Sequence, residues 1–232
     1  MKAVILAGGL GTRLKPFTEA IPKPLLPIGE KAILEIQIER LKESGFNEIF
    51  LATNYMSDYI ENFFGDGSRY GVKLIVSKES IPLGTAGPLT LLKDYLDESF
   101  IVMNGDILSL IDFQKFFAFA MEKNTLLTVA IKKEILPFAF GNIFFEGDFV
   151  TGIQEKPSII THILSGIYVM KPEIFKYIPE NTNFGIDKLI LNFLKSDIQV
   201  SKYELTEYWL DIGRVSDYEK AQKDFGNNIN LK

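Results

Sequence analysis

The stretch "VILAGGLGTRLKPFTEAIPKPLLPIG", residues 4–29, runs an apolar segment into a glycine cluster and then into a long irregular loop. Its four prolines, at 16, 22, 24 and 27, favour an extended chain over a regular helix. Glycines after a first strand commonly let main-chain N–H groups approach a phosphate closely. Because structureless chain of this length inside a compact domain is usually functional, we expect a phosphate-binding loop here.

Two common phosphate-binding designs do not fit the spacing. A dinucleotide fingerprint needs a third glycine where "GLGTRL" has Leu14, and an acidic residue where the second strand ends in Thr53 and Asn54. The ATPase loop, G-x-x-x-x-G-K-[ST], occurs nowhere in the chain. A dehydrogenase or a P-loop ATPase is therefore disfavoured. Binding of NADH would be needed to support the dehydrogenase hypothesis.

What remains is a loop in which glycines and separated cations occur together. Gly8, Gly9 and Gly11 would bring main-chain N–H groups to a polyphosphate, while Arg13 and Lys23 would supply charge from two sides. A solvated basic surface loop is the plain alternative, but it does not explain the glycines. The phosphate hypothesis accounts for both features.

Composition limits the class of protein to which this loop belongs. The chain has 232 residues, of which 47% are hydrophobic and 24% charged, as in a soluble globular protein with one large core. A net charge of −5 argues against a nucleic-acid partner. No apolar run is long enough for membrane insertion, and the start of the chain is too short in apolar residues for a signal peptide. The absence of cysteine excludes disulfides and fits a cytoplasmic location.

Strands are expected to alternate with helices in the first half. Short aliphatic runs typical of a parallel sheet buried on both faces occur at 2–7, 48–53, 72–77 and 99–104. Helical patterns occur at 31–43, from a Thr85 cap through 92, and from an Asp112 cap through 123. The order predicts an α/β fold: a Rossmann-like, doubly wound, mostly parallel mixed sheet flanked by helices in three layers.

The second half has closer-spaced strand patterns, at 125–133, 141–156 and 162–171, with a hairpin turn at 146–148. These predict antiparallel additions to the sheet and a small antiparallel subregion beside it. His162, the only histidine, is expected to be an ordinary strand residue. A last helix is expected after Ser216 as its N-cap, and the tail 227–232 is expected to fray.

Seven short motifs in order resemble one known family. They are "LAGGLGTRLKPFT" with "PKPLLPI", "ESIPLGTAGPL" (79–89), "NGD" (104–106), "FG" (140–141), "EKP" (155–157), "SGIYVM" (165–170) and "YWLDIG" (208–213). Together they make the chain similar, over nearly its whole length, to the sugar-1-phosphate nucleotidylyltransferases, or nucleotide-sugar pyrophosphorylases. The resemblance implies a single nucleotidyltransferase domain, 1–226, with a nucleotide-binding half (about 1–110) and a sugar-phosphate-binding half (about 111–226).

The resemblance also implies a reaction and its catalytic groups. In the family, a sugar phosphate oxygen attacks the α-phosphorus of a nucleoside triphosphate and expels pyrophosphate. Positions matching Arg13 and Lys23 contact the triphosphate, and those matching Asp106 and Asp211 hold Mg²⁺. Two carboxylates with phosphate and water oxygens suit this hard cation. A phosphate monoester is mostly ionised at neutral pH, so a catalytic histidine is not needed.

Further positions are carried over as binding residues. For the nucleotide they are Leu6, Ala7, Gly8, Gly9, Gly11, Thr12, Arg13, Lys23, Glu79, Gly84, Thr85, Asn104 and Gly105. For the sugar phosphate they are Gly141, Glu155, Lys156 and Gly166. The Glu79 carboxylate could accept two hydrogen bonds from guanine, although a solvent-facing role is an open alternative. One departure from the family is Phe140, which stands where many members have tyrosine.

The partners expected from this resemblance are GTP and a sugar 1-phosphate, with "PLGTAG" most similar to guanylyltransferases for mannose or heptose 1-phosphate. A uridylyltransferase for muramic or glucosamine 1-phosphate, or a cytidylyltransferase for a sugar or choline phosphate, stays open. So does a non-catalytic nucleotide-sugar sensor. The resemblance implies a role in polysaccharide or lipopolysaccharide biosynthesis at the cell surface. A homo-oligomer is allowed, but the sequence does not set the oligomeric state.

Overall fold

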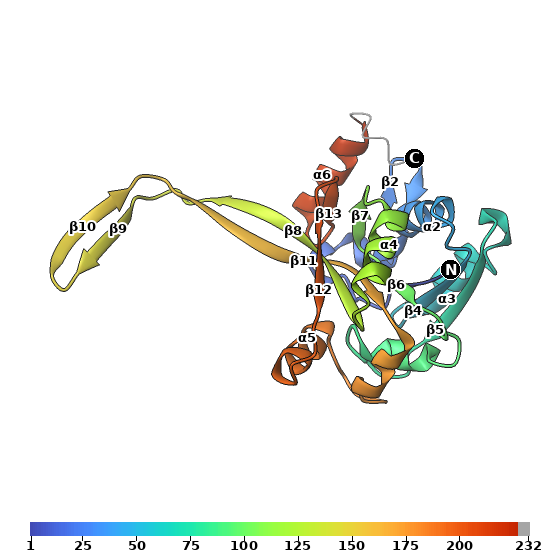
Figure 1. Ribbon diagram of the computed structural model, residues 1–232. Helices are drawn as coiled ribbons and strands as arrows, with labels where there is room; N and C mark the ends of the chain where they lie inside the picture. The colour runs from blue at the N-terminus through green and yellow to red at the C-terminus, as the bar shows by residue number, and fades with distance from the viewer. Residues whose placement is uncertain (227–232) are drawn as a thin grey trace.

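A seven-stranded sheet forms the centre of the protein, which a computed structural model describes over residues 1–226 (Figure 1). The strand order is β12-β8-β11-β6-β1-β4-β5. In that order the strands are Ser201–Leu205, Leu127–Pro137, Ser158–Met170, Phe100–Asn104, Lys2–Leu6, Glu48–Thr53 and Lys73–Lys78. The tail 227–232, expected to fray, lies outside the described residues.

Parallel pairing predominates in this sheet. Strand β1 pairs in parallel with β4 and β6, β4 with β5, and β12 with β8, whereas β11 is antiparallel to both β6 and β8. The predicted mixed, mostly parallel sheet is therefore confirmed, and the four predicted strands of the first half lie within one residue of their expected bounds. The helix α5 and the strand β12 were not anticipated.

Helices cover both faces because successive strand residues alternate between two cores. On β1, Ala3 and Ile5 join one core while Val4 joins the other, and all three are fully buried. The first core contains α2 (Ile33–Glu43), α3 (Ser57–Phe64) and α4 (Phe113–Lys123). The second contains η4 (Gly87–Leu92), η5 (Pro172–Tyr177) and α5 (Ile186–Lys195). The three-layer, doubly wound prediction is thus confirmed.

A third, smaller core lies under the first loop. It joins loop residues such as Leu14 and Leu26 to α6 (Val215–Gly226) and to the short pair β7 (Ile107–Ser109) and β13 (Trp209–Asp211). The loop was expected to be extended, but it forms local turns. These are η1 (Thr12–Leu14), α1 (Phe17–Ala20), η2 (Lys23–Leu25), β2 (Pro27–Ile28) and β3 (Lys31–Ala32). The prolines interrupt helical turns without preventing them, since proline is tolerated in a first turn.

Two predicted caps were wrong and one was right. The Thr85 hydroxyl accepts a hydrogen bond from the Ile186 N–H at 2.9 Å, so it lies at the start of α5, a helix distant in sequence. Ser216 lies inside α6, which begins one residue earlier. The Asp112 carboxylate accepts a hydrogen bond from the Lys115 N–H at 2.9 Å and caps α4 as predicted.

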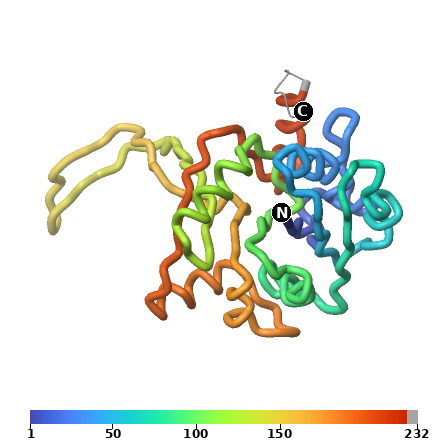
Figure 2. The backbone as a smooth tube through the Cα atoms, turned by 45° about the vertical axis from the view of Figure 1, so that its right-hand side comes forward, coloured from blue at the N-terminus to red at the C-terminus, as the bar shows by residue number. Residues whose placement is uncertain are grey.

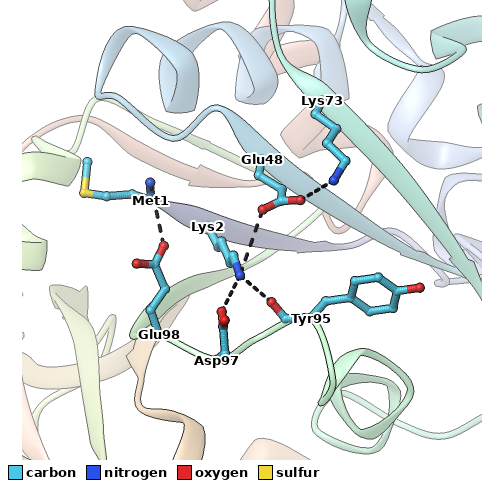
Figure 3. Close-up of polar contacts among 7 residues, drawn as sticks. All are labelled: Met1, Lys2, Glu48, Lys73, Tyr95, Asp97 and Glu98. Atoms are coloured by element: carbon cyan, nitrogen blue, oxygen red, sulfur yellow. Dashed lines mark hydrogen bonds and ion pairs between the residues drawn. The ribbon is translucent and has the colours of Figure 1, made fainter.

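Ion pairs gather at the amino ends of the parallel strands (Figure 3). Lys2 donates to the Tyr95 carbonyl at 2.6 Å and to the Asp97 carboxylate, and Glu48 pairs with Lys73 at 2.6 Å. The Asp97 carboxylate raises the pKa of Lys2 against the opposing effect of burial. Exposed pairs of this kind stabilise a protein only slightly, so they add little to the stability of the sheet.

The second half adds an antiparallel arm, residues 132–164, which projects away from the rest of the chain in both views (Figures 1 and 2). Its inner part is the β8–β11 ribbon beyond the sheet, and its outer part is a hairpin of β9 (Asn142–Glu146) and β10 (Phe149–Gln154). Gly147, with φ +55°, lies in the turn, which confirms the predicted hairpin.

The Asp112 cap gives a test of how α4 is held. We expect Asp112→Ala to lower the free energy of unfolding by about 1 kcal/mol, because the Lys115 N–H at the start of the helix loses its acceptor. Asp112→Asn, which keeps an acceptor oxygen, should cost only a few tenths of that amount. Urea unfolding followed by circular dichroism would measure both, and equal losses would show that the cap is unimportant.

Candidate functional site

A cleft opens at the carboxyl ends of β1 and β6, where polar loops replace the apolar strands. It consists of two connected chambers, of about 300 and 390 Å³, which share Leu6, Gly9, Leu10 and Asp106. These volumes are in the range of small-molecule sites. Ligands of open α/β sheets bind at this edge, so we call it the glycine-loop cleft.

The glycine loop is held in place by a buried threonine. The Thr18 hydroxyl donates to the Gly11 carbonyl at 2.8 Å, and Thr18 is only 3% exposed. Gly11 has φ +61°, and a Cβ there would lie 2.8 Å from the Thr18 methyl group. Any side chain at this position would therefore be strained and would push the loop from its support.

Two cations, Arg13 and Lys23, and the carboxylate of Asp106 line the first chamber. Lys23, 8% exposed, donates from Nζ to Asp106 Oδ2 at 2.5 Å. Arg13 lines the same chamber on η1, and its guanidinium lies near Gly213, just after β13. The ion pair of Lys23 with Asp106 joins the first loop to the turn after β6. Residues 83 positions apart in the sequence therefore form one charged centre.

Asp211 approaches this centre from β13. It pairs with Ile107 across the β7–β13 ladder, beside the turn that carries Asp106. Burial raises the pKa of the Asp211 carboxyl, and the Asp106 charge raises it further, while Lys23 and Arg13 lower it. The two carboxylates are thus close enough to interact, which is the arrangement that a cation would stabilise.

One further observation indicates that these carboxylates suit a magnesium ion. Asp106 Oδ1 is buried and has no hydrogen-bond partner, while its Oδ2 is taken by Lys23. An acceptor left free in this way suits a metal ligand. Within residues 1–226, no group of three or more His, Asp or Glu side chains is arranged to hold a metal. Mg²⁺ would therefore need oxygens from a substrate as well as from Asp106 and Asp211.

The second chamber is lined by Glu79, Gly84 and Thr85, beyond the ends of β4 and β5. Glu79 Oε2 accepts a hydrogen bond from the Leu83 N–H at 2.8 Å, and Oε1 lies 3.0 Å from the position of a Cβ at Gly8. Burial raises the pKa of this carboxyl, against the lowering effect of the Leu83 N–H. Glu79 therefore faces the cleft, and its alternative as a solvent-facing residue is not supported.

The structure brings together every residue carried over for the nucleotide. The members lining the first chamber are Leu6, Ala7, Gly9, Gly11, Thr12, Arg13, Lys23 and Gly105. Those lining the second are Leu6, Gly8, Gly9, Glu79, Gly84, Thr85 and Asn104. This shared location does not test their roles, which stay predictions.

The sugar-phosphate residues are divided. Gly166, with φ +73°, lies against Asn104, since a Cβ there would be 2.7 Å from Asn104 Nδ2. Gly141, Glu155 and Lys156 lie on the arm instead, at the junction of its two ribbons. None of these three lines the glycine-loop cleft.

Gln37 on α2 supports the site and was missed by the sequence argument. Its buried amide donates to the Asn104 carbonyl at 3.0 Å and to the Ile107 carbonyl at 2.7 Å. These carbonyls flank Gly105 and Asp106, so one side chain holds the turn that presents the carboxylate. A polar residue among the apolar positions of an amphipathic helix was the available signal.

Comparisons with known proteins show which family the chain is similar to. A family model described as nucleotidyl transferase matches residues 2–228. The chain is 37% identical over 227 residues to a probable mannose-1-phosphate guanylyltransferase 1 of Oryza sativa subsp. japonica, covering 94% of this chain and 63% of that protein. It is 33% identical over 242 residues to a UTP–glucose-1-phosphate uridylyltransferase of Synechocystis, covering 95% and 62%. The chain thus spans less than two thirds of these relatives.

A solved structure is also similar. It is the HddC of Yersinia pseudotuberculosis complexed with GMP-PN, with a TM-score of 0.73, 30% identity, and coverage of 97% of this chain and 99% of that one. Among the described residues, no helix has the length and apolar character to cross a membrane.

Gln37→Leu tests the support of the Asp106 turn. We expect it to lower the free energy of unfolding by about 1–3 kcal/mol, because two buried carbonyls lose a donor. Gln114→Leu is a matched control, since Gln114 is exposed on α4 and its change should stay within about 0.5 kcal/mol. Chemical unfolding of both variants gives the comparison, and similar values would remove the supporting role of Gln37.

Proposed function

The chain belongs to the nucleotidyl transferase family, and on this basis we propose that it transfers a nucleoside monophosphate from a nucleoside triphosphate to a sugar 1-phosphate. The observation that supports this most is the convergence of Arg13, Lys23, Asp106 and Asp211 beside the glycine loop. This centre offers cations for a polyphosphate and carboxylates for a metal ion.

The reaction needs alignment and charge neutralisation more than acid–base chemistry. An oxygen of the sugar phosphate forms a bond to the α-phosphorus, the bond from that phosphorus to the β-phosphate oxygen breaks, and pyrophosphate leaves with the electron pair. The nucleophile is already ionised near neutral pH. The main task of the protein is therefore to bring two anions together and to stabilise the charge that builds on the leaving group.

The proposed roles follow from position. Arg13 and Lys23 would contact the triphosphate and favour departure of pyrophosphate, while main-chain N–H groups of the glycine loop would orient the phosphates. Asp106 and Asp211 would hold Mg²⁺, which would neutralise phosphate charge. The ion pair of Lys23 with Asp106 keeps both side chains in position before a substrate binds.

GTP is the nucleotide we favour. Glu79 lies in the second chamber with Oε1 on the cleft side, where it can accept from the N–H donors of guanine. The rice relative is a probable guanylyltransferase, and the Yersinia structure holds GMP-PN. A mannose, related hexose or heptose 1-phosphate is the acceptor we propose. The pathway would be cytoplasmic supply of an activated sugar for cell-surface glycan.

A uridylyltransferase is the second candidate. The Synechocystis relative, named a UTP–glucose-1-phosphate uridylyltransferase, favours it. Because one Glu79 oxygen is already bonded to the Leu83 N–H, the carboxylate has less capacity for a second base donor. The ratio of kcat/KM for GTP to kcat/KM for UTP would decide between the two candidates.

Pyrophosphate release with Mg²⁺ tests the reaction. Five nucleoside triphosphates crossed with hexose, heptose and amino-sugar 1-phosphates should give turnover in at least one combination. We expect Asp106→Asn to lower kcat by about 100-fold or more, because the metal loses a charged ligand. Asp94→Asn, on an exposed aspartate outside the cleft, should leave the rate unchanged. Nucleotide binding without turnover in any combination would favour a sensor instead.

Glu79→Gln tests the base. Loss of a charged acceptor costs about 1.5–3 kcal/mol, so kcat/KM for GTP should fall about 10- to 100-fold. The value for UTP should change less, because uracil presents one such donor where guanine presents more. Steady-state kinetics with both nucleotides would measure the ratio, and equal losses would place Glu79 outside base recognition.

A further inference from the structure

The arm exposes an unusual amount of apolar surface. Half of the large apolar side chains that are exposed in the described part of the chain lie in the thirty residues 135–164. Three of its phenylalanines, Phe140, Phe145 and Phe149, are 72%, 73% and 79% exposed. Monomeric soluble proteins rarely expose contiguous apolar surface on this scale, so the arm is built to be covered.

Both faces of the outer hairpin are apolar. Neighbouring residues on a strand point to opposite faces, and Phe144 and Phe145 are adjacent on β9 with exposed fractions of 50% and 73%. A lone two-stranded hairpin is marginally stable in water. A partner that covered one face of the hairpin would leave the apolar side chains of the other face in water. We therefore expect the hairpin to insert between surfaces of another folded protein.

The arm also carries a polar cluster already in place. A Cβ at Gly141 would lie 3.1 Å from Glu155 Oε2, so the two residues are adjacent across the chain reversal. The Phe138 N–H donates to the Pro157 carbonyl at 2.9 Å and closes this junction. Lys156, which lies between Glu155 and Pro157 in the sequence, has φ +45°. Residues other than glycine adopt this backbone conformation at some cost in energy. Backbone strain at such a position is common at ligand sites.

The inner ribbon keeps this cluster away from its own cleft. Seven consecutive residue pairs join β8 and β11 from Ile131–Leu164 to Pro137–Ser158. At 3.3 Å per residue these pairs span about 20 Å. The ribbon leaves the sheet at Gly166, beside Asn104, and continues outward in both views (Figures 1 and 2). Return of Lys156 to its own cleft would require this ribbon to bend or unpair.

The cleft lacks charge for a second anion, if the proposed function holds. Its lining cations, Arg13 and Lys23, are matched in number by the lining carboxylates Asp106 and Glu79. A sugar phosphate would add about −1.5 to −2 charges beside the triphosphate. The proposed Mg²⁺ would neutralise part of the triphosphate charge, but no lining side chain is left to balance the sugar phosphate. Lys156 is the cation that the family resemblance assigns to this phosphate.

We propose that two copies of this chain exchange arms, so that Gly141, Glu155 and Lys156 of each copy complete the sugar-phosphate subsite of the other. The role of these residues in a sugar-phosphate subsite rests on the proposed function. The exchange of arms does not depend on that function. A symmetric exchange covers both arms at once and closes as a dimer. Each protomer alone would then have a nucleotide cleft without its acceptor subsite.

The body exposes apolar side chains on its first loop, against which the hairpin of a second copy would pack. Leu10 lines both chambers of the cleft and is 58% exposed, and Phe17 and Ile21 on the following loop are 43% and 41% exposed. Phe140, Phe144, Phe145 and Phe149 of the arm would together bury roughly 500 Å² per arm, and about twice that in an exchanged pair. With the aliphatic residues of the arm, the exchange reaches the size of a stable dimer interface.

Cysteine cross-linking tests the exchange without any assay of activity. The chain contains no cysteine, so Leu10→Cys with Ile153→Cys gives one thiol at the cleft mouth and one on the arm. A short bis-maleimide should yield covalent dimers of this double variant on a denaturing gel, and also link a Leu10→Cys chain to an Ile153→Cys chain of different tag. A link within one chain, or no link while light scattering shows a monomer near 26.2 kDa, would overturn the proposal.

Subunit complementation tests the contribution to the subsite. Lys156→Ala and Asp106→Asn should each abolish most turnover alone. After unfolding and refolding together, the mixture should recover about a quarter of wild-type activity, because half of randomly paired dimers are mixed and each holds one intact site. No recovery, with mixed dimers present, would show that each arm serves its own cleft.

The two experiments separate the two failures. Intermolecular cross-links from a protein without turnover would leave the exchange standing and remove the proposed function. Turnover in wild-type protein that runs as a monomer at assay concentration would keep the function and remove the exchange. Lys156→Arg is the matched control for the complementation, since it keeps the charge and should retain more activity than Lys156→Ala.

Discussion

The partly buried ion pair of Lys23 with Asp106 is the contact on which the site depends. It connects a long, proline-rich loop to the turn after β6, and it does so at a position where Lys23 is almost fully removed from solvent. A charge in such a place is costly unless it is paired, and loss of one partner typically costs about 3–5 kcal/mol. The loop therefore closes over the sheet in an arrangement that pairs the two charges.

Other contacts make that arrangement unique. Thr18 holds the Gly11 carbonyl from inside the loop, and Gln37 holds the Asp106 turn from α2. Asp211 is then brought in by the β7–β13 ladder, which raises the electrostatic cost of leaving two carboxylates without a cation. The cleft is consequently prepared for a metal and a polyphosphate, while the opposite end of the sheet carries only surface ion pairs.

The arm separates nucleotide binding from acceptor binding within one chain. Its polar cluster is preformed at the junction of two ribbons, yet its apolar faces have no cover on the described part of the chain. Exchange of arms between copies would bury the apolar surface of the arm. It would also bring Lys156 to the cleft of the other copy as the cation for the sugar phosphate. It would also make acceptor binding depend on protein concentration, because an isolated protomer would lack Lys156 at its cleft.

The sequence by itself determined the four strands of the first half and the mostly parallel pattern of the sheet, because aliphatic runs and their spacing are local signals. The residues assigned to the nucleotide came from the resemblance of short motifs to one family, and all of them line the cleft. It could not assign the Thr85 hydroxyl to the start of α5, or reveal that Gln37 supports the Asp106 turn, since both depend on contacts between distant segments. Only the tertiary structure decided where Gly141, Glu155 and Lys156 lie. Motif order indicates that residues belong to one function, but the distance between them depends on how far a ribbon extends before it turns back.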